Sequence, residues 1–286
     1  MAEFTFNKPE WSTDPKPLDF KLVDQPLEEV TNKMILLLKN DRRKPTNFYF
    51  LLWGLLTASS QTYHAIRKLV AKDPKYPTQA YVLGRPLIDT LFTVVALIEE
   101  PMCHSRKYEL AGYKVEWEKY DRQLERYGDE PQWKSYLEEK KKYLNESAKL
   151  YVLSKDEKQN PAKHIAFWPI PSQMLKSNMI STEESRVFLK EVYDWRYRQI
   201  SEWGHHAWGG MALGVFQTVP ERQWHPGKLE SDAVYTGILF LLMILSEIEA
   251  SCGYRAKQQL RYVWTILSNH FDEAAHYYDL RYQALL

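Results

Sequence analysis

Arginine, serine and histidine recur at helical spacing within the segment Tyr193–Gly210, which reads YDWRYRQISEWGHHAWGG. On a helix that turns by about 100° per residue, Arg198, Ser201 and His205 lie on one face. The guanidinium group of arginine binds phosphate, and histidine exchanges a proton near neutral pH. General acid–base cleavage of RNA needs such groups, because one must move the 2′-hydroxyl proton while another stabilises the charged phosphate.

Four more polar residues are expected to support these three. Glu202 and His206 belong to the same segment. Arg85 and Asp89 lie four residues apart in the apolar stretch RPLIDTLFTVVALIEE, so they share one face of a helix. Charged groups buried without partners cost several kcal/mol. The pair is therefore either a buried ion pair that fixes helix register or an anchor for the site, and we expect it to converge with the Arg198 segment.

A carboxylate-bridged metal site is a second chemistry to weigh. Glu202 with His205, and Glu273 with His276, each form a Glu-x-x-His motif, and di-iron bundles use two such motifs plus a glutamate on each of two other helices. The glutamates of the preceding helix lie near Gly253, about 20 Å from the level of Glu273 at about 1.5 Å per residue. The second half-site is therefore incomplete, and the sequence predicts neither a metal nor another cofactor.

Nucleophilic and nucleotide chemistry have less support. The chain has no glycine-flanked serine elbow, no GxxxxGK[ST] loop and no GxGxxG loop. Ser201 and His205, at positions i and i+4 of one helix, can form a hydrogen bond but do not create an oxyanion hole. Serine hydrolase and dinucleotide-binding functions are therefore not predicted.

Composition limits the functional classes and the cellular location that are expected for the chain. The 286 residues carry 38 Lys and Arg against 37 Asp and Glu, a net charge of +1 that argues against a broad nucleic-acid-coating surface. Cys103 and Cys252 form no CxxC pair, so neither a disulfide framework nor a cysteine zinc site is expected, and a cytoplasmic location is predicted. The most apolar run, Ala233–Leu245, is shorter than the ~20 residues of a membrane span. It is predicted to be a buried core helix, with no membrane partner.

The pattern of proline and apolar residues predicts an all-α chain. Residues 1–25 contain Pro9, Pro15 and Pro17 and no regular period, so we expect an extended N-terminal arm. Residues 26–286 are expected to form a single bundle domain of about eight helices, with no strand and no internal repeat. Helices are expected over residues 26–40, 46–71, 78–98, 105–127, 131–153, 181–210, 230–252 and 255–286, with a loop over 155–181.

Two motifs resemble a family of bacterial all-helical proteins known only as a domain of unknown function. Its members have an Arg-x-Leu-x-acid helix, matched by Arg85, Leu87 and Asp89, although Asp89 stands where glutamate is more usual and Pro86 departs from the pattern. They also have a Tyr-x-x-hydrophobic-Ser-x-x-x-His helix. This second motif is matched by Tyr197, Ile200, Ser201 and His205. The resemblance covers about residues 47–215 and implies an all-helical fold without implying an activity.

The spacing of Arg198 and His205 also resembles the Arg-x6-His motif of HEPN-type helical ribonucleases, which are common in toxin–antitoxin and anti-phage systems. This resemblance implies metal-independent RNA cleavage, with Arg198 on the phosphate, His205 as acid or base, and Arg85 and Asp89 holding the site electrostatically. It also implies a homodimer through the 193–210 helix, because HEPN-type sites usually form across a dimer. RNA and a second copy of the chain are then the expected partners, and a separate partner protein is left open.

Two other functions remain open. The same cluster could belong to a non-catalytic helical binding or scaffold module, where it would act as a structural network or a partner surface. The two Glu-x-x-His motifs leave a metal protein with carboxylate and histidine ligands as a third hypothesis.

Overall fold

The computed structural model describes residues 18–71, 75–151, 153–204 and 226–286, with backbone alone for 202–204 and 226–228. These ranges contain helices and no strand, which confirms the all-α fold class. They form two compact units. The first contains the described residues up to Glu99 and from Met174 onward, and the second is the intervening segment Glu100–Gln173. The single domain expected over 26–286 stays a prediction, and its described residues cluster into these two units.

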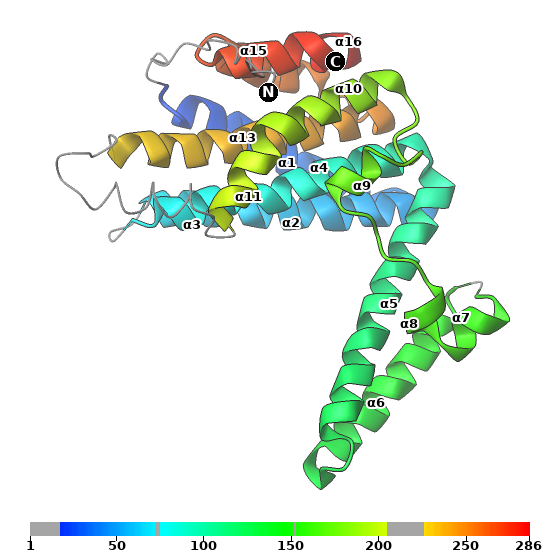
Figure 1. Cartoon of the computed structure of the whole chain (residues 1–286). Coiled ribbons are helices and arrows are strands. Elements are labelled where there is room, and N and C mark those ends of the chain that lie inside the picture. Colours follow the sequence, from blue (N-terminus) through cyan, green and yellow to red (C-terminus); the bar gives the residue numbers. More distant parts are fainter. Residues whose placement is uncertain (1–17, 72–74, 152, 205–225) are drawn as a thin grey trace, which may run out of the picture. The chain divides into compact units, whose positions relative to one another are not determined.

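The first unit is a bundle of long helices with shorter ones at its edges (Figure 1). In chain order its helices before the second unit are α1 (Lys21–Asn40), α2 (Thr46–Ala71), α3 (Pro77–Val82) and α4 (Gly84–Glu99). After the second unit come α10 (Glu183–Val192), the π-helix η1 (Tyr193–Tyr197), α11 (Arg198–Gly204), α13 (Pro226–Cys252), α14 (Lys257–Ser268), α15 (Asp272–Tyr277), the π-helix η3 (Tyr278–Tyr282) and α16 (Gln283–Leu285). The short helix α9 (Pro171–Met174) lies where the sequence returns to the first unit.

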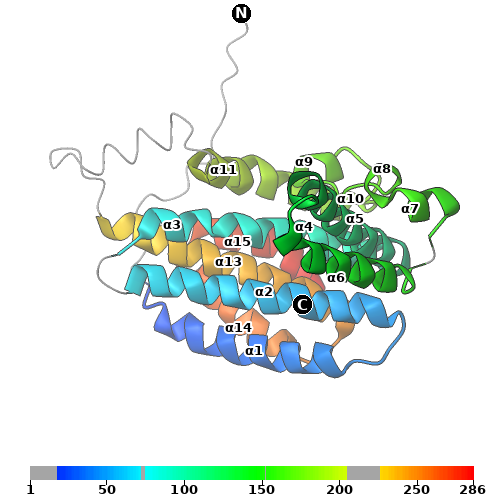
Figure 2. The same cartoon turned by 90° about the horizontal axis from the view of Figure 1, so that it is seen from below.

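Helix α13 is the centre of the first unit. It packs against α2, α3, α4, α1 and α14, and Figure 2 shows α1 and α2 running beside it. Nearly every side chain from Ala233 to Ile248 is buried, which confirms the predicted core helix. Both Leu229–Cys252 and Pro77–Glu99 are long and apolar enough to cross a membrane by length and composition. The most apolar window of Leu229–Cys252 is 94% buried inside the fold, as in the core helices of soluble proteins.

Helix α1 begins earlier than expected. The extended arm was predicted to reach residue 25, but α1 starts at Lys21 and contains Pro26. Asp19 begins the helix by accepting a hydrogen bond from the Lys21 amide at 3.0 Å. Val23 and Leu27 are fully buried on either side of the proline. Their burial outweighs the one backbone hydrogen bond that Pro26 removes.

The helix expected over residues 78–98 is divided. Helix α3 ends at Val82 and α4 begins at Gly84. Pro86 explains the break, because its ring clashes with the carbonyl group four residues earlier, at Val82, and it has no amide hydrogen to bond there. The first residues of α4 therefore carry Arg85 at the start of a new helix.

The helix expected over residues 255–286 is divided into α14 and the run of α15, η3 and α16. Helix α13 ends at Cys252, as predicted, and Gly253 follows with a φ of 69°. The helix expected over 255–286 is interrupted after α14, where Phe271 is extended and its ring stacks on Tyr235 at a centroid distance of 4.0 Å. Stacking of this half-buried ring on Tyr235 of α13 holds the turn between α14 and α15.

The second unit is a helical hairpin with its own apolar core. Its helices are α5 (Pro101–Tyr127), α6 (Pro131–Ala148), α7 (Lys155–Gln159) and α8 (Pro161–His164). The buried core residues are Leu110, Tyr113, Tyr120, Leu137, Leu144, Leu153 and Ile165. Helices α5 and α6 correspond to the helices expected over 105–127 and 131–153. In α6, Leu137 and Leu144 are buried, Trp133 packs against the core, and Tyr136 is exposed.

Candidate functional site

The two charged residues of α4 meet the 193–210 segment at Tyr197. Nη2 of Arg85 donates a hydrogen bond to the Tyr197 hydroxyl at 3.2 Å, and the guanidinium carbon lies 5.3 Å from the centre of the tyrosine ring. The Asp89 carboxyl lies near the same hydroxyl, because Tyr197 acts to lower the pKa of Asp89 and the charge of Asp89 acts to raise the pKa of Tyr197. Tyr197 therefore interacts with both Arg85 and Asp89, and we call these three residues the Tyr197 cluster.

The electrostatics of the Tyr197 cluster are set by burial. Burial raises the pKa of the Asp89 carboxyl, while the charge of Arg85 and the hydrogen bond from Tyr197 act to lower it. Burial also raises the pKa of Tyr197, and the nearby charge of Asp89 adds to this effect. Asp89 therefore holds a proton more readily than an ordinary aspartate does. Shifts of this kind occur both at acid–base sites and in structural networks.

Close packing at Gly84 holds α11 and α13 against α4. A Cβ atom at Gly84 would lie 2.7 Å from Cγ2 of Thr236 and 3.1 Å from Cδ1 of Ile200. Such distances leave no room for a side chain, so glycine permits the three helices to approach. Ile200 and Leu87, the apolar members of the two family-like motifs, are both fully buried. The apolar positions of both motifs are therefore core positions.

The predicted catalytic residues have different surroundings. Arg198 is exposed, at the first position of α11. Ser201 lies one turn further, and its hydroxyl oxygen is buried with no hydrogen-bond partner among the described residues. Glu202 lies within α11, where only the backbone is described. His205 and His206 fall outside the described residues, so their convergence with Arg85 and Asp89 stays a prediction.

Arg196 was not predicted from the sequence, and it is partly buried, with a side chain that is 16% exposed. Its Nε donates to Oε1 of Glu273 at 2.6 Å, its Nη2 bonds the second carboxylate oxygen, and its guanidinium carbon lies 5.5 Å from the centre of the Tyr235 ring. Burial acts to lower the pKa of Arg196, but the charge and hydrogen bonds of Glu273 raise it well above the ordinary value. A signal was present, because Arg196 lies four residues after Val192 and four before Ile200, both buried.

The π-helix η1 explains how Arg196 and Tyr197 both turn inward. The Arg198 amide bonds the carbonyl of Tyr193, a spacing of five residues that adds one residue to the turn. An ideal helical wheel has no such residue, so it does not predict two neighbouring inward side chains. Tyr193 stacks on Tyr197 at a centroid distance of 5.2 Å within this turn.

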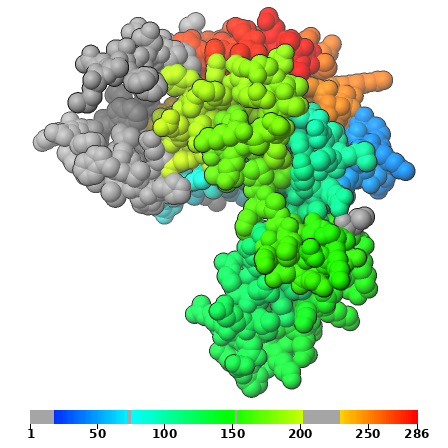
Figure 3. Space-filling model, turned by 45° about the vertical axis from the view of Figure 1, so that its right-hand side comes forward, coloured from blue at the N-terminus to red at the C-terminus, as the bar shows by residue number. Residues whose placement is uncertain are grey.

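A second π-helix repeats the same design. The η3 sequence YDLRY matches the η1 sequence YDWRY at four of five positions, although no internal repeat was expected. Its Arg281 bonds the buried carboxylate of Glu247 with distances of 2.5 and 2.9 Å. Each π-helix therefore delivers one arginine to one buried glutamate. Figure 3 shows the yellow-green surface of α10 next to the red surface of the C-terminal helices, and His276 contacts Glu191 there at 2.6 Å.

The contacts of Glu273 and His276 argue against the hypothesis of a metal site with carboxylate and histidine ligands. Glu273 is bonded to Arg196, whereas His276 is bonded to Glu191, so the two residues of this motif have separate partners. Glu247 is bonded to Arg281. The carboxylates that a bridged metal pair would need thus serve as partners of protein cations.

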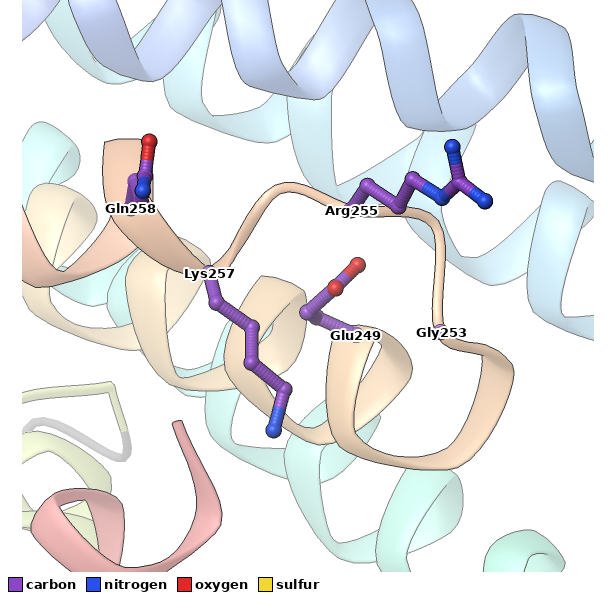
Figure 4. A pocket seen from close by; sticks show the side chains of 5 residues that line it. All are labelled: Glu249, Gly253, Arg255, Lys257 and Gln258. Atoms are coloured by element: carbon purple, nitrogen blue, oxygen red, sulfur yellow. The ribbon is translucent and has the colours of Figure 1, made fainter.

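A surface pocket at the turn between α13 and α14 is also explained by the fold (Figure 4). It is lined by Glu249, Gly253, Arg255, Lys257 and Gln258. Figure 4 shows the Glu249 carboxylate beneath the turn, where it accepts hydrogen bonds from the backbone amides of the residues before and after Arg255 at 3.0 and 3.1 Å. Arg255 has a φ of 60°, a left-handed conformation that these bonds stabilise. Glu249 therefore shapes the turn.

The fold and the Tyr197 cluster define an all-helical protein in which two motif-bearing helices meet through a tyrosine. The model of DUF5677, a family of unknown function, matches residues 49–219. This match covers more than half of the chain, and the protein belongs to that family. The match agrees with the resemblance over about residues 47–215. No curated protein and no solved structure matches the chain.

Proposed function

We propose that this protein is a metal-independent, HEPN-like ribonuclease that acts in the cytoplasm in a toxin or anti-phage role. One observation carries the proposal: Arg198 is exposed directly after Tyr197, whose hydroxyl links Arg85 and Asp89. An arginine beside a fixed polar cluster suits the binding of a phosphodiester, because the cluster sets the local charge before substrate arrives. The Arg-x6-His spacing adds His205 as the proton-transfer group.

The proposed reaction is an internal transfer within RNA. The 2′-hydroxyl oxygen bonds to the adjacent phosphorus as its proton leaves, and the bond from phosphorus to the 5′ oxygen breaks as that oxygen gains a proton. His205 moves one of these protons, and Arg198 stabilises the charge that develops on the phosphate. The products are a 2′,3′-cyclic phosphate and a 5′-hydroxyl. Ser201, whose hydroxyl is buried, suits a packing role better than contact with a polymer.

RNA cleavage by matched variants tests the proposal. Arg198→Ala and His205→Ala are each expected to lower the cleavage rate by roughly 100-fold or more, because each removes a group used in the transition state. Arg261→Ala on α14 and His64→Ala on α2 change exposed residues of the same types, and should cleave like the wild type. Circular dichroism of all four variants monitors folding, and cleavage should persist in EDTA.

An inactive wild-type protein would favour the other function. The Tyr197 cluster joins α4 to η1, which is also what a non-catalytic binding or scaffold module needs. If pure protein cleaves no RNA from a varied set, or if Arg198→Ala and His205→Ala cleave normally, the ribonuclease proposal fails.

We propose in addition that the active form is a homodimer through the 193–210 helix. Light scattering is expected to give twice the chain mass of 33.9 kDa at concentrations where RNA is cleaved. A monomer that cleaves RNA would contradict this arrangement.

A further inference from the structure

The first turn of α5 brings three different metal-binding groups together. Glu100 is the N-cap residue, and Cys103 and His104 follow within the first turn. Their ligand atoms all lie within 4.8 Å of one another. Nε2 of His104 is 3.9 Å from Oε2 of Glu100. All three residues belong to the second unit, and none takes part in the proposed ribonuclease site.

These separations are close to those of a bound zinc ion. Zinc lies about 2.0–2.3 Å from nitrogen, oxygen and sulfur ligands in tetrahedral sites, which places neighbouring ligand atoms roughly 3.3–3.8 Å apart. The observed 3.9 Å between Glu100 and His104 needs a shift of a few tenths of an ångström. His104 is buried, whereas Glu100 and Cys103 are exposed and can change rotamer. Rotation of these two side chains can therefore bring their ligand atoms closer to the His104 ring.

The kinds of ligand indicate which ion. A thiolate, an imidazole and a carboxylate together favour zinc over magnesium or calcium, which prefer oxygen ligands alone. A thiolate and a carboxylate bring two negative charges that balance the ion. The N-terminus of a helix disfavours a bare cation, so this neutral set suits the position of the site in the first turn of α5.

We infer that Glu100, Cys103 and His104 bind one zinc-class divalent cation. The three side chains fill three tetrahedral positions, and water or another small ligand fills the fourth. Binding displaces the proton of the Cys103 thiol, which leaves to solvent as the metal–sulfur bond forms. No cysteine zinc site was expected from the sequence, because the chain has no CxxC pair. The proposed site instead uses a single cysteine with two other ligand types.

Titration of the full-length protein with cobalt and zinc tests the inference. After EDTA treatment and buffer exchange, Co²⁺ is expected to bind at one equivalent and give a thiolate-to-cobalt charge-transfer band. Cys103→Ser should abolish that band and weaken zinc binding at least tenfold in competition with a chelating dye. Glu100→Gln should weaken zinc binding while leaving the band. Both positions are exposed, so neither variant should disturb folding.

Matched controls separate this site from other ligands. His64→Gln changes an exposed histidine of the first unit, and Cys252→Ala leaves Cys103 as the single cysteine. Both should bind cobalt like the wild type. Binding below one equivalent, a charge-transfer band that survives Cys103→Ser, or zinc affinity unchanged in both site variants would overturn the inference. Because these experiments measure metal binding and not RNA cleavage, their outcome does not depend on the proposed ribonuclease function.

Discussion

Tyr197 joins two helices through a single hydroxyl group. A phenol can accept one hydrogen bond and donate another. Here it accepts from Arg85 and lies near Asp89, so the two charged residues meet at a neutral group. The ring adds a cation–aromatic contact with Arg85. The Tyr197 position of the family-like motif thus has a structural role whether or not the chain is an enzyme.

Removing this hydroxyl should cost stability. Tyr197→Phe is expected to lower the free energy of unfolding by about 1–2 kcal/mol, because Arg85 and Asp89 lose a partner in a partly buried site. Urea unfolding followed by circular dichroism measures the change. Tyr193→Phe removes the neighbouring phenol of the stacked pair and should change stability less. Equal losses in both variants would show that the Tyr197 hydrogen bonds contribute nothing specific.

Residue types predicted part of this site. An arginine and an aspartate four residues apart in an apolar stretch had to find partners, and that requirement pointed to Arg85 and Asp89. Their partner is a tyrosine from a distant segment, which spacing along one helix does not specify. The pairing of Arg196 with Glu273 was not predicted for a similar reason: spacing places Arg196 beside buried residues of its own helix, but it does not identify a partner from a distant segment.

At the scale of elements, each π-helix is held to a neighbouring helix by an arginine–glutamate pair. Arg196→Met in η1 leaves the Glu273 carboxylate buried without its cation, so the free energy of unfolding should fall by roughly 3–5 kcal/mol. The double variant Arg196→Met, Glu273→Met should be more stable than the single one, because no unpaired charge remains. Chemical unfolding of both variants measures the difference. A double variant that is less stable than Arg196→Met would contradict the explanation.

Glycine substitutions test the contact of α4 with its neighbours. Gly84→Ala should lower the free energy of unfolding by about 1–3 kcal/mol, because the new methyl group overlaps Thr236 and Ile200. Gly54→Ala on α2 meets nothing within 4 Å and should instead raise stability by about 0.5–1 kcal/mol through helix propensity. Thermal unfolding of the two variants in parallel should shift in opposite directions. A neutral Gly84→Ala would refute the close approach of these helices.

Helix boundaries were predictable where proline or glycine sets them. The starts at Thr46 and Pro131 and the end at Cys252 agree with the sequence analysis. The π-turn of η1 was not predictable from periodicity, because a helical wheel assumes a constant rotation per residue. The interruption at Phe271 depends on a ring stacked on a residue of another helix, so local propensity does not predict it.

At the scale of the whole molecule, the second unit is an insertion of residues Glu100–Gln173, which begins after α4 and ends within α9. Its two long helices were expected, but its separation as a compact unit was not. Linkers usually differ in composition from domains, whereas here α4 ends at Glu99 and α5 begins at Pro101. The aromatic and leucine core of residues 100–173 supplies the contacts that make this unit compact.

Glu99 joins the two chain segments of the first unit that flank the insertion. Its carboxylate accepts hydrogen bonds from the backbone amides and hydroxyl groups of Ser181 and Thr182, just before α10. Burial acts to raise the pKa of Glu99, but hydrogen bonds from Ser181, Thr182 and Ser185 lower it to about 2. The end of α4 is thereby held to the start of the helix that leads to Tyr197.

This shift predicts an acid-sensitive contribution to stability. Because the pKa of Glu99 is lower in the folded chain than in the unfolded chain, its stabilising effect is complete above about pH 4.3, the ordinary glutamate value, and is lost as the pH falls toward 2. Glu99→Gln should therefore unfold more easily than the wild type at pH 7, by roughly 1–2 kcal/mol. The difference should disappear at the acid end of this range.

Urea unfolding of wild type and variants across this pH range measures the effect. Glu184→Gln, an exposed change in the first turn of α10, serves as the matched control and should differ little from the wild type at any pH. General acid unfolding affects all three proteins alike, so the gap between wild type and Glu99→Gln isolates this one carboxylate. A stability difference between wild type and Glu99→Gln that is constant with pH would mean that Glu99 acts through its shape rather than its charge. The contact between the end of α4 and the start of α10 would then need another explanation.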